Sequence, residues 1–366
     1  MNTIESTKKY ESWLSQFFAP VAPDLHRKHE QMREDSFTFL RATFYRWAQN
    51  WRQLPSAIRR APDVLAVGDA HVENFGTWRD GEGRLVWGVN DFDEAATIPY
   101  TSDLARLATS AWLARLEGKL TLSAHRICPA ILRGYADALR RGGRAIVLDS
   151  GPRWLRNLVQ SESRDDEAYW EKLLALPAWR GAIPRRARTL LGALEPPARR
   201  LRFVHRVSGV GSLGRPRFAA LYVSTGGLAA REVKARAPSA WHWARDESVA
   251  PEQNVLPRIW RRAIRSQDPY LHAGKRWIHR RLAADCSRID LDAIPMRRRE
   301  SDVLTAMGWE LANIHLGSIS ARSLREHLDT LDANWLPEAA TQMAEATQRD
   351  FAAWTQTKVR ETSDRA

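Results

Sequence analysis

Two acidic blocks constrain the fold of this chain more than any other feature, because each directly follows a short apolar run. The first run, in PDVLAVGDA, leads into GDAHVENFG at 68–76, and the second, in GRLVWGVNDFD, leads into NDFDEA at 90–95. Between the runs, TWRDGEGR carries an Asp-Gly turn signal. The pattern predicts two strands paired as a β-hairpin, with charged side chains at their ends.

The acidic blocks carry three side chains that suit magnesium chemistry. Asp69 and Asn74 stand five residues apart on the loop after the first strand, and Asp91 ends the second strand. Mg²⁺ prefers hard oxygen ligands, usually one or two carboxylates together with substrate phosphates and water. Asp91 and Asn74 are therefore the candidate metal ligands, and Asp69 is left to orient or deprotonate an attacking hydroxyl. The alternative is that all three are turn and cap residues. Asp93 could contact a second cation or simply accept a backbone N–H.

A glycine-rich segment, SGVGSLG, gives a second signal. Gly209, Gly211 and Gly214 lie between two predicted strands, and Lys234 follows 20 residues later in REVKA. A dinucleotide-binding fold requires a helix after such glycines, so the flanking strands argue against it. A glycine hairpin over nucleotide phosphates, with a lysine from a later strand, fits better. The predicted nucleotide-binding residues are Gly209, Gly211, Ser212, Gly214 and Lys234. An ordinary glycine-rich hairpin with an exposed lysine is the alternative.

Helices dominate the rest of the chain. Apolar positions at helical spacing predict helices at 3–60, 101–118, 122–143, 165–175, 255–266, 302–318 and 334–358. Thr101 and Ser102 are the expected caps of the second of these, and Asp35 or Ser36 of a helix within 3–60. Strands are predicted within 201–214, which ends in a glycine-rich turn, and at 215–224, 228–235 and 275–283, with Thr225-Gly226-Gly227 as a turn between the second and third.

The chain is basic, with 56 Lys and Arg against 43 Asp and Glu and a net charge of +13. This charge would attract nucleic acid, acidic membrane or phosphorylated ligands. The arginines are scattered in pairs, however, which favours solvated faces over a nucleic-acid groove. Cys128 and Cys286 have no metal-ligand spacing and predict neither a disulfide framework nor a zinc site. Without an apolar leader or a membrane-length apolar stretch, we expect a cytoplasmic protein with no membrane partner.

The acidic blocks resemble the catalytic and metal loops of the protein-kinase-like superfamily, above all its aminoglycoside and choline kinase branch. In that branch the catalytic loop has the sequence motif Gly-Asp-x-His-x-x-Asn, and a hairpin and an Asp-containing metal-binding motif follow it. The matching positions are Gly68, Asp69, His71, Asn74 and Asp91. The resemblance also implies that His71 supports the loop, and that Asp103 in SDLARLA braces it from behind.

The order of these motifs is unusual, because Asp69 precedes the glycine loop and the helix at 302–318 resembles the one that normally precedes the catalytic loop. The chain therefore resembles a circularly permuted kinase-like α+β fold, which is possible when the original termini lie close together. It also resembles the uncharacterised bacterial family called domain of unknown function 2252, through GDAHVENFG, NDFDEA, the later GVGSLG and an N-terminal segment. The matching positions of that segment are Met32, Phe37, Phe39 and Arg41.

The resemblance implies two lobes with different roles. A helical catalytic lobe is expected at 1–200, a β-rich nucleotide lobe at 201–290, and helices returning to the catalytic lobe at 291–366. The implied activity is phosphoryl transfer from Mg²⁺·ATP to an unidentified small-molecule or protein acceptor. A nucleotide-binding pseudokinase and a nucleotidyl (AMP) transferase of the same fold are the alternatives.

One departure from the kinase pattern concerns the partner of Lys234. The helix expected to offer it a glutamate reads RIWRRAIRS and offers arginine. Glu247 and Glu252 are the nearby candidates to take that place.

Overall fold

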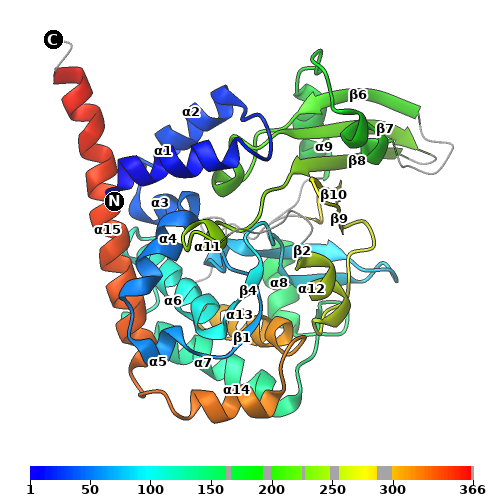
Figure 1. Ribbon diagram of the computed structural model, residues 1–366. Coiled ribbons are helices and arrows are strands. Elements are labelled where there is room, and N and C mark those ends of the chain that lie inside the picture. The colour runs from blue at the N-terminus through cyan, green and yellow to red at the C-terminus, as the bar shows by residue number, and fades with distance from the viewer. Residues whose placement is uncertain (162–165, 193–198, 225–226, 248–254, 287–298, 364–366) are drawn as a thin grey trace.

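The computed structural model describes residues 1–161, 166–192, 199–224, 227–247, 255–286 and 299–363. The chain folds into a mixed α and β structure (Figure 1), with a large helical body at the lower left and a five-stranded sheet at the upper right. The first two helices lie beside that sheet, and the long last helix runs down the far side of the body. No helix of the described residues is long and apolar enough to cross a membrane.

Within the described residues the strands form antiparallel sheets. The strands are β1 (Asp63–Ala66), β2 (Phe75–Arg79), β3 (Leu85–Val89), β4 (Ala96–Pro99), β5 (Ile146–Val147), β6 (Arg199–His205), β7 (Arg217–Ser224), β8 (Gly227–Ala235), β9 (His272–Ala273) and β10 (Trp277–Leu282). Their orders are β1-β4, β2-β3-β5 and β6-β7-β8-β10-β9.

The predicted hairpin exists, but with a different first strand. β3 pairs with β2, which lies within and after the first acidic block, whereas the apolar run before that block forms β1 and pairs with β4. The prediction was wrong on this partner because Gly68, with a φ of +79°, turns the chain away after β1. The Asp-Gly turn joins β2 to β3, and Asp80 accepts the backbone N–H groups of Glu82 and Arg84 there.

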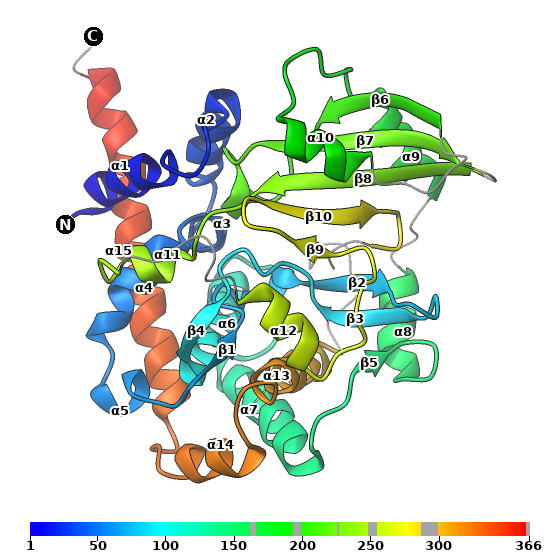
Figure 2. The same cartoon turned by 45° about the vertical axis from the view of Figure 1, so that its right-hand side comes forward.

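The five-stranded sheet holds the glycine-rich segment between its first two strands and Lys234 on its third. The strand predicted within 201–214 is β6, which ends at His205, and the glycine-rich turn predicted after it contains the 3-10 turn η3 (Val210–Ser212). Apolar clusters lie on both faces of this sheet (Figure 2), with α10 (Arg185–Leu191) on one face and α9 (Asp166–Ala175) on the other. Residues 225 and 226 of the predicted turn lie outside the described residues.

The N-terminal helical region is a series of short helices. They are α1 (Thr3–Leu14), α2 (Ala22–Gln31), α3 (Ser36–Ala42), α4 (Phe44–Asn50), η1 (Trp51–Gln53) and α5 (Ser56–Arg59). Asp35 caps α3 as predicted, since its carboxylate accepts the N–H of Thr38 at 2.5 Å. Prolines contribute to the division, because Pro23 lies in the first turn of α2 and Pro55 immediately precedes α5.

The remaining helices build the body. They are α6 (Tyr100–Leu116), α7 (Ala124–Arg141), α8 (Arg153–Ser161), α11 (Ala240–Trp243), α12 (Leu256–Arg262), α13 (Glu300–His315), α14 (Ala321–Leu328) and α15 (Trp335–Ser363). α6 begins directly after Pro99, so the predicted caps Thr101 and Ser102 lie inside its first turn instead. α15 packs along α6 (Figure 1), and α13 crosses α7 very closely. Glycine permits that crossing, because a Cβ on Gly134 would lie 1.8 Å from the Thr305 carbonyl oxygen.

Candidate functional site

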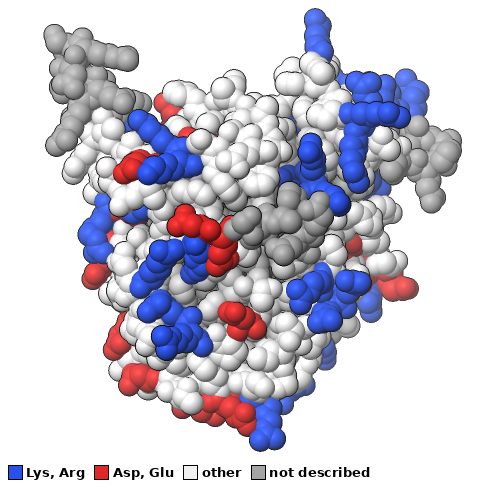
Figure 3. Space-filling model, in the orientation of Figure 1, with Lys and Arg blue, Asp and Glu red and all other residues white. Residues whose placement is uncertain are grey.

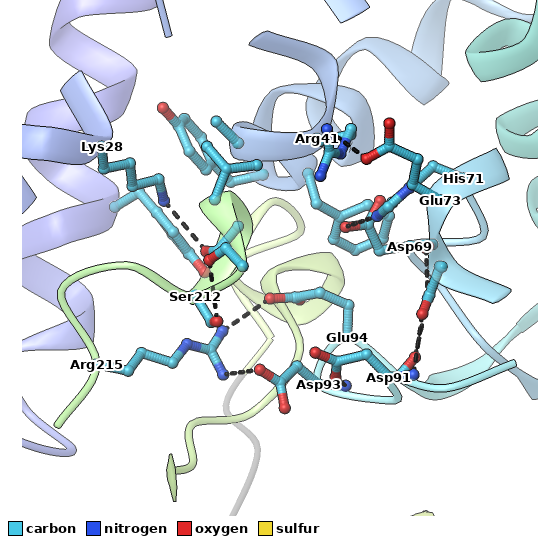
Figure 4. Close-up of a pocket in the computed structure, with 18 residues that line it drawn as sticks. Lys28, Arg41, Asp69, His71, Glu73, Asp91, Asp93, Glu94, Ser212 and Arg215 are labelled. Carbon is cyan, nitrogen blue, oxygen red and sulfur yellow. Dashed lines mark hydrogen bonds and ion pairs between the residues drawn. The ribbon is translucent and has the colours of Figure 1, made fainter. Parts of the chain in front are cut away.

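The two acidic blocks and the glycine-rich loop meet around one cavity of about 70 Å³ (Figure 4). Its walls come from the loop after β1, the loop after β3, the η3 turn, and the N-terminal helices α2, α3 and α4. Segments that are far apart in the sequence therefore contribute to one site.

Backbone geometry places Asp69 at this cavity. Gly68 precedes it with a φ of +79°, and a Cβ on Gly68 would lie 2.1 Å from the carbonyl oxygen of Glu94. Only glycine fits that position, where the two acidic loops touch. His71 lines the cavity, and its backbone N–H donates to the Asp69 carbonyl at 3.0 Å.

Asp103, which the resemblance places behind the Asp69 loop, makes hydrogen bonds to the backbone of that loop. This fully buried carboxylate accepts the backbone N–H groups of Val67 and Gly68 at 2.7 and 2.8 Å. His315, at the end of α13, lies with its Nε2 at 3.0 Å from the same carboxylate, and its Nδ1 lies 2.9 Å from the hydroxyl of Tyr135. Helix α6 is thus bonded directly to the loop through Asp103, and α13 and α7 are connected to it through His315 and Tyr135.

The two oxygens of Asp69 have different environments. Oδ1 accepts two hydrogen bonds from the guanidinium of Arg106, at 2.9 and 2.6 Å. Oδ2 lies near Gly211, where an added Cβ would be 4.0 Å away, and 3.9 Å from Nε2 of His71. Burial raises the pKa of Asp69, although Arg106 opposes that change. Oδ2 is therefore the oxygen that faces the glycine-rich loop.

Asn74 ties the two acidic loops together. Its Nδ2 donates to the carbonyl oxygens of Asp69 and Asp91 at 3.0 and 2.9 Å, and its Oδ1 accepts the N–H of Asp91 at 2.9 Å. The amide is thus engaged at both ends, and one lone pair of Oδ1 remains for another ligand.

Lys234 brings the five-stranded sheet to the acidic loops. Its ammonium lies 3.0 Å from Asp91 Oδ2 and 2.6 Å from Asp93 Oδ2. Asp91 and Lys234 are 143 residues apart in the sequence. Glu247 was one candidate partner of Lys234, but its Oε2 lies 2.7 Å from Nδ1 of His242 instead. Glu252, the other candidate, lies outside the described residues.

The predicted nucleotide-binding glycines divide into two groups. Gly209, Gly211 and Ser212 line the cavity, and the hydroxyl of Ser212 accepts a 2.7 Å hydrogen bond from Arg217. Gly214 does not line it, because that residue packs against Leu25 of α2.

Sequence reasoning missed several charged residues of the cavity (Figure 4). Arg215 lies 2.9 Å from Glu94 and 3.4 Å from Asp93, and Arg41 lies 2.7 Å from Glu73. The position of Arg215 directly after the glycine-rich loop is a signal that could have identified it.

Lys28 is another cavity residue with no sequence signal, since only tertiary packing places α2 over the glycine loop. It is buried, and its ammonium makes a weak 3.4 Å hydrogen bond to the carbonyl of Gly211. Burial lowers its pKa to about 8.

The lowered pKa of Lys28 predicts a pH effect on stability. The unfolded lysine keeps its ordinary pKa of about 10.4, so between pH 8 and 10.4 the unfolded state binds more protons. Relative to Lys28→Met, the wild type should gain roughly 3 kcal/mol of unfolding free energy as pH rises through this window. Urea denaturation of both proteins at several pH values measures the difference. If the difference in unfolding free energy between the two proteins did not change with pH, the lowered pKa of Lys28 would be contradicted.

The carboxylates of the site suit a hard cation. Asp91 and Asp93 already converge on one positive group, the ammonium of Lys234. No group of three or more His, Cys, Asp or Glu side chains that could hold a metal occurs among the described residues. Mg²⁺ is usually bound by one or two carboxylates, and substrate phosphates and water complete its coordination. Asp91 and Asp93 therefore fit this ion, with the remaining lone pair of Asn74 as a further ligand.

Comparison with known proteins connects the chain to one family. Residues 21–175 match the model of a family described as an uncharacterized protein conserved in bacteria (DUF2252). The matched part contains both acidic blocks and ends before the five-stranded sheet. No curated protein matches the chain, and no solved structure does. Over residues 21–175 the chain is thus similar to this bacterial family, whose description names no activity.

Proposed function

We propose that this protein is a Mg²⁺- and ATP-dependent phosphotransferase with a circularly permuted, kinase-like active site. The observation that carries the proposal is the 3.0 Å contact between Lys234 and Asp91 beside the Asp69 loop. Lys234 and Asp91 are 143 residues apart in the sequence. By resemblance to kinases, Lys234 would bind phosphate, Asp91 would hold magnesium and Asp69 would act on the acceptor, all around one triphosphate.

The five-stranded sheet supports this assignment. Its glycine-rich loop joins the first two strands, and Lys234 lies on the third, β8. Kinases place a glycine-rich loop over the ATP phosphates and supply the phosphate-binding lysine from the third strand of the same sheet. Here the sheet follows the acidic loops in the sequence, whereas in ordinary kinases it precedes them.

Asp69 is the proposed acceptor-side residue. Arg106 engages Oδ1, so Oδ2 is available to orient an acceptor hydroxyl or take its proton. Burial raises the pKa of Asp69, which makes its carboxylate a stronger base. Asp103 and Asn74 would keep this loop fixed during the reaction.

Charged groups around the cavity would bind the nucleotide. The ammonium of Lys234 and backbone N–H groups of the glycine-rich loop would contact phosphate oxygens, and Asp91 and Asp93 would hold magnesium. Magnesium bound to the phosphates would neutralise negative charge that develops during transfer. The acceptor would be a molecule whose hydroxyl group receives the phosphoryl group.

The cavity must widen before a nucleotide can bind. Its volume of about 70 Å³ is well below the roughly 300–1,000 Å³ of ordinary small-molecule sites. The N-terminal region holds the glycine-rich loop down, since Val21 N donates to Gly214 O at 2.9 Å and Lys28 reaches Gly211 O. We propose that this loop lifts to admit the nucleotide, as mobile loops do in many enzymes.

Mg²⁺·ATP should stabilise the folded protein. A ligand that binds only the native state at 100 times its Kd adds about 2.7 kcal/mol of unfolding free energy. Differential scanning fluorimetry with Mg²⁺·ATP, ATP with EDTA, and Mg²⁺ alone measures the change. The Asp91→Asn variant is the matched control, and its melting temperature should respond much less. An unchanged wild-type melting temperature at millimolar Mg²⁺·ATP would refute the nucleotide site.

A further inference from the structure

The positive charge of the chain is concentrated in one segment. Residues 176–236 contain 13 Lys and Arg but only two Asp and Glu, so this sixth of the chain carries +11 of the total +13. The rest of the protein is nearly neutral. Arginine pairs occur throughout the chain, but in this segment almost no acidic residues lie between them.

Some of these cations have internal partners. Arg215 contacts Glu94, Arg206 and Arg217 contact the fully buried Glu232, and Lys234 contacts Asp91. A second group faces solvent and makes no ion pair within the described residues. That group is Arg180, Arg185, Arg186, Arg188, Arg199 and Arg200, which we call the arginine face.

The arginine face surrounds α10 and the edge strand β6. α10 covers one face of the five-stranded sheet, and residue 179 lies beside β6, where its N–H donates to the Phe203 carbonyl at 2.8 Å. In Figure 3, Lys and Arg side chains gather over the upper right of the molecule, whereas the visible Asp and Glu side chains lie elsewhere. This surface is therefore positive over several neighbouring elements.

Aromatic rings accompany the cations. Trp179 is 36% exposed, and its ring lies near the rings of Phe218 and His205, at centroid distances of 5.6 and 5.7 Å. Arg200 places its guanidinium 4.5 Å from the centroid of the Phe203 ring. An exposed ring such as Trp179, beside arginines that make no ion pair among the described residues, is the combination with which proteins hold single-stranded nucleic acid, through base stacking and phosphate contacts.

We propose that the arginine face binds single-stranded nucleic acid, with phosphates on the arginines and a base stacked on Trp179. Neighbouring like charges repel one another, and an anionic chain relieves that repulsion. Every cation of the face is arginine, whose planar fork binds phosphate in a bidentate manner. A membrane surface attracts lysine and arginine alike. The exposed indole of Trp179 beside these arginines favours a ligand whose bases can stack on it. The proposal does not depend on the phosphotransferase activity.

Fluorescence anisotropy of labelled U20 RNA and dT20 DNA, measured between 50 and 300 mM salt, tests the proposal. Each phosphate contact to a single strand contributes about −0.7 to the slope of log K against log salt. The triple variant Arg185→Gln, Arg186→Gln, Arg188→Gln should bind at least about tenfold more weakly at 50 mM salt, and its slope should be smaller by about 2.

Two further variants isolate the cause. Arg140→Gln, Arg141→Gln, Arg325→Gln removes the same charge from exposed positions on α7 and α14, at the far end of the molecule (Figure 1), and should bind like the wild type. Trp179→Leu keeps apolar packing but removes the indole, so it should lose at least about fivefold in affinity with an unchanged salt slope. Equal loss in the two triple variants would overturn the proposal. So would binding to vesicles of phosphatidylcholine and phosphatidylserine without binding to either oligonucleotide.

Discussion

Asp69→Asn should reduce the turnover number by about 10²–10⁴-fold, the range expected for loss of a general base. Asparagine keeps the size of the side chain, and its carbonyl oxygen can still accept hydrogen bonds from Arg106. It cannot take a proton from an acceptor hydroxyl. The affinity for Mg²⁺·ATP should change little, because the proposed role of Asp69 lies on the acceptor side.

The turnover number can be measured before the acceptor is known if the enzyme transfers phosphate slowly to water. Hydrolysis of γ-labelled ATP then reports turnover, and equilibrium binding of a fluorescent ATP analogue reports affinity. Asp91→Asn is the informative companion, since it should weaken Mg²⁺-dependent nucleotide binding. Circular dichroism must show both variants folded, because Asp69→Asn leaves the buried Arg106 without its carboxylate. Equal loss of nucleotide binding in the two folded variants would contradict the separate roles.

Asp103→Ala should lower the free energy of unfolding by about 3–5 kcal/mol, the cost of breaking a buried charged network. The substitution leaves the N–H groups of Val67 and Gly68 unpaired in the interior and removes the partner of His315. Urea denaturation measures the loss directly.

A matched control for this variant lies on the neighbouring helix α7. Asp137 is part-exposed there and, among the described residues, forms an ion pair with Arg140 on the same helix. Asp137→Ala should therefore change stability by less than about 0.5 kcal/mol. A cost below about 1 kcal/mol for Asp103→Ala would mean that the carboxylate does not hold the loop.

The sequence predicted the parts of the site that depend on local spacing. Asp69 and Asn74 are separated by only five residues, and Gly209, Gly211 and Ser212 lie within four residues, so their arrangement follows from nearby chain geometry. The strand that carries Lys234 was also identified, as a short segment that follows a predicted Thr-Gly-Gly turn. Asp103 was found through resemblance, and the hydrogen bonds to Val67 and Gly68 explain its position.

Contacts between distant segments were harder to predict. The pairing of β1 with β4 depends on where the chain turns after Gly68, and the position of Lys28 depends on how α2 packs against the glycine loop. Arg106 could have been suspected, because it lies three residues after Asp103 on α6 and so one helical turn further on. Nothing in its local sequence shows that it contacts Asp69.

The order in which the segments of the site occur along the chain has a consequence for synthesis on the ribosome. Lys234 is made 143 residues after Asp91, and His315 is made 212 residues after Asp103. At about 5–20 residues per second, roughly 7 to 30 s separate the acidic loop from the lysine that neutralises it. The brace on that loop is completed later still. Until then the acidic loops do not have both Lys234 and His315 beside them, and the full set of contacts described above can form only after α13 has left the ribosome.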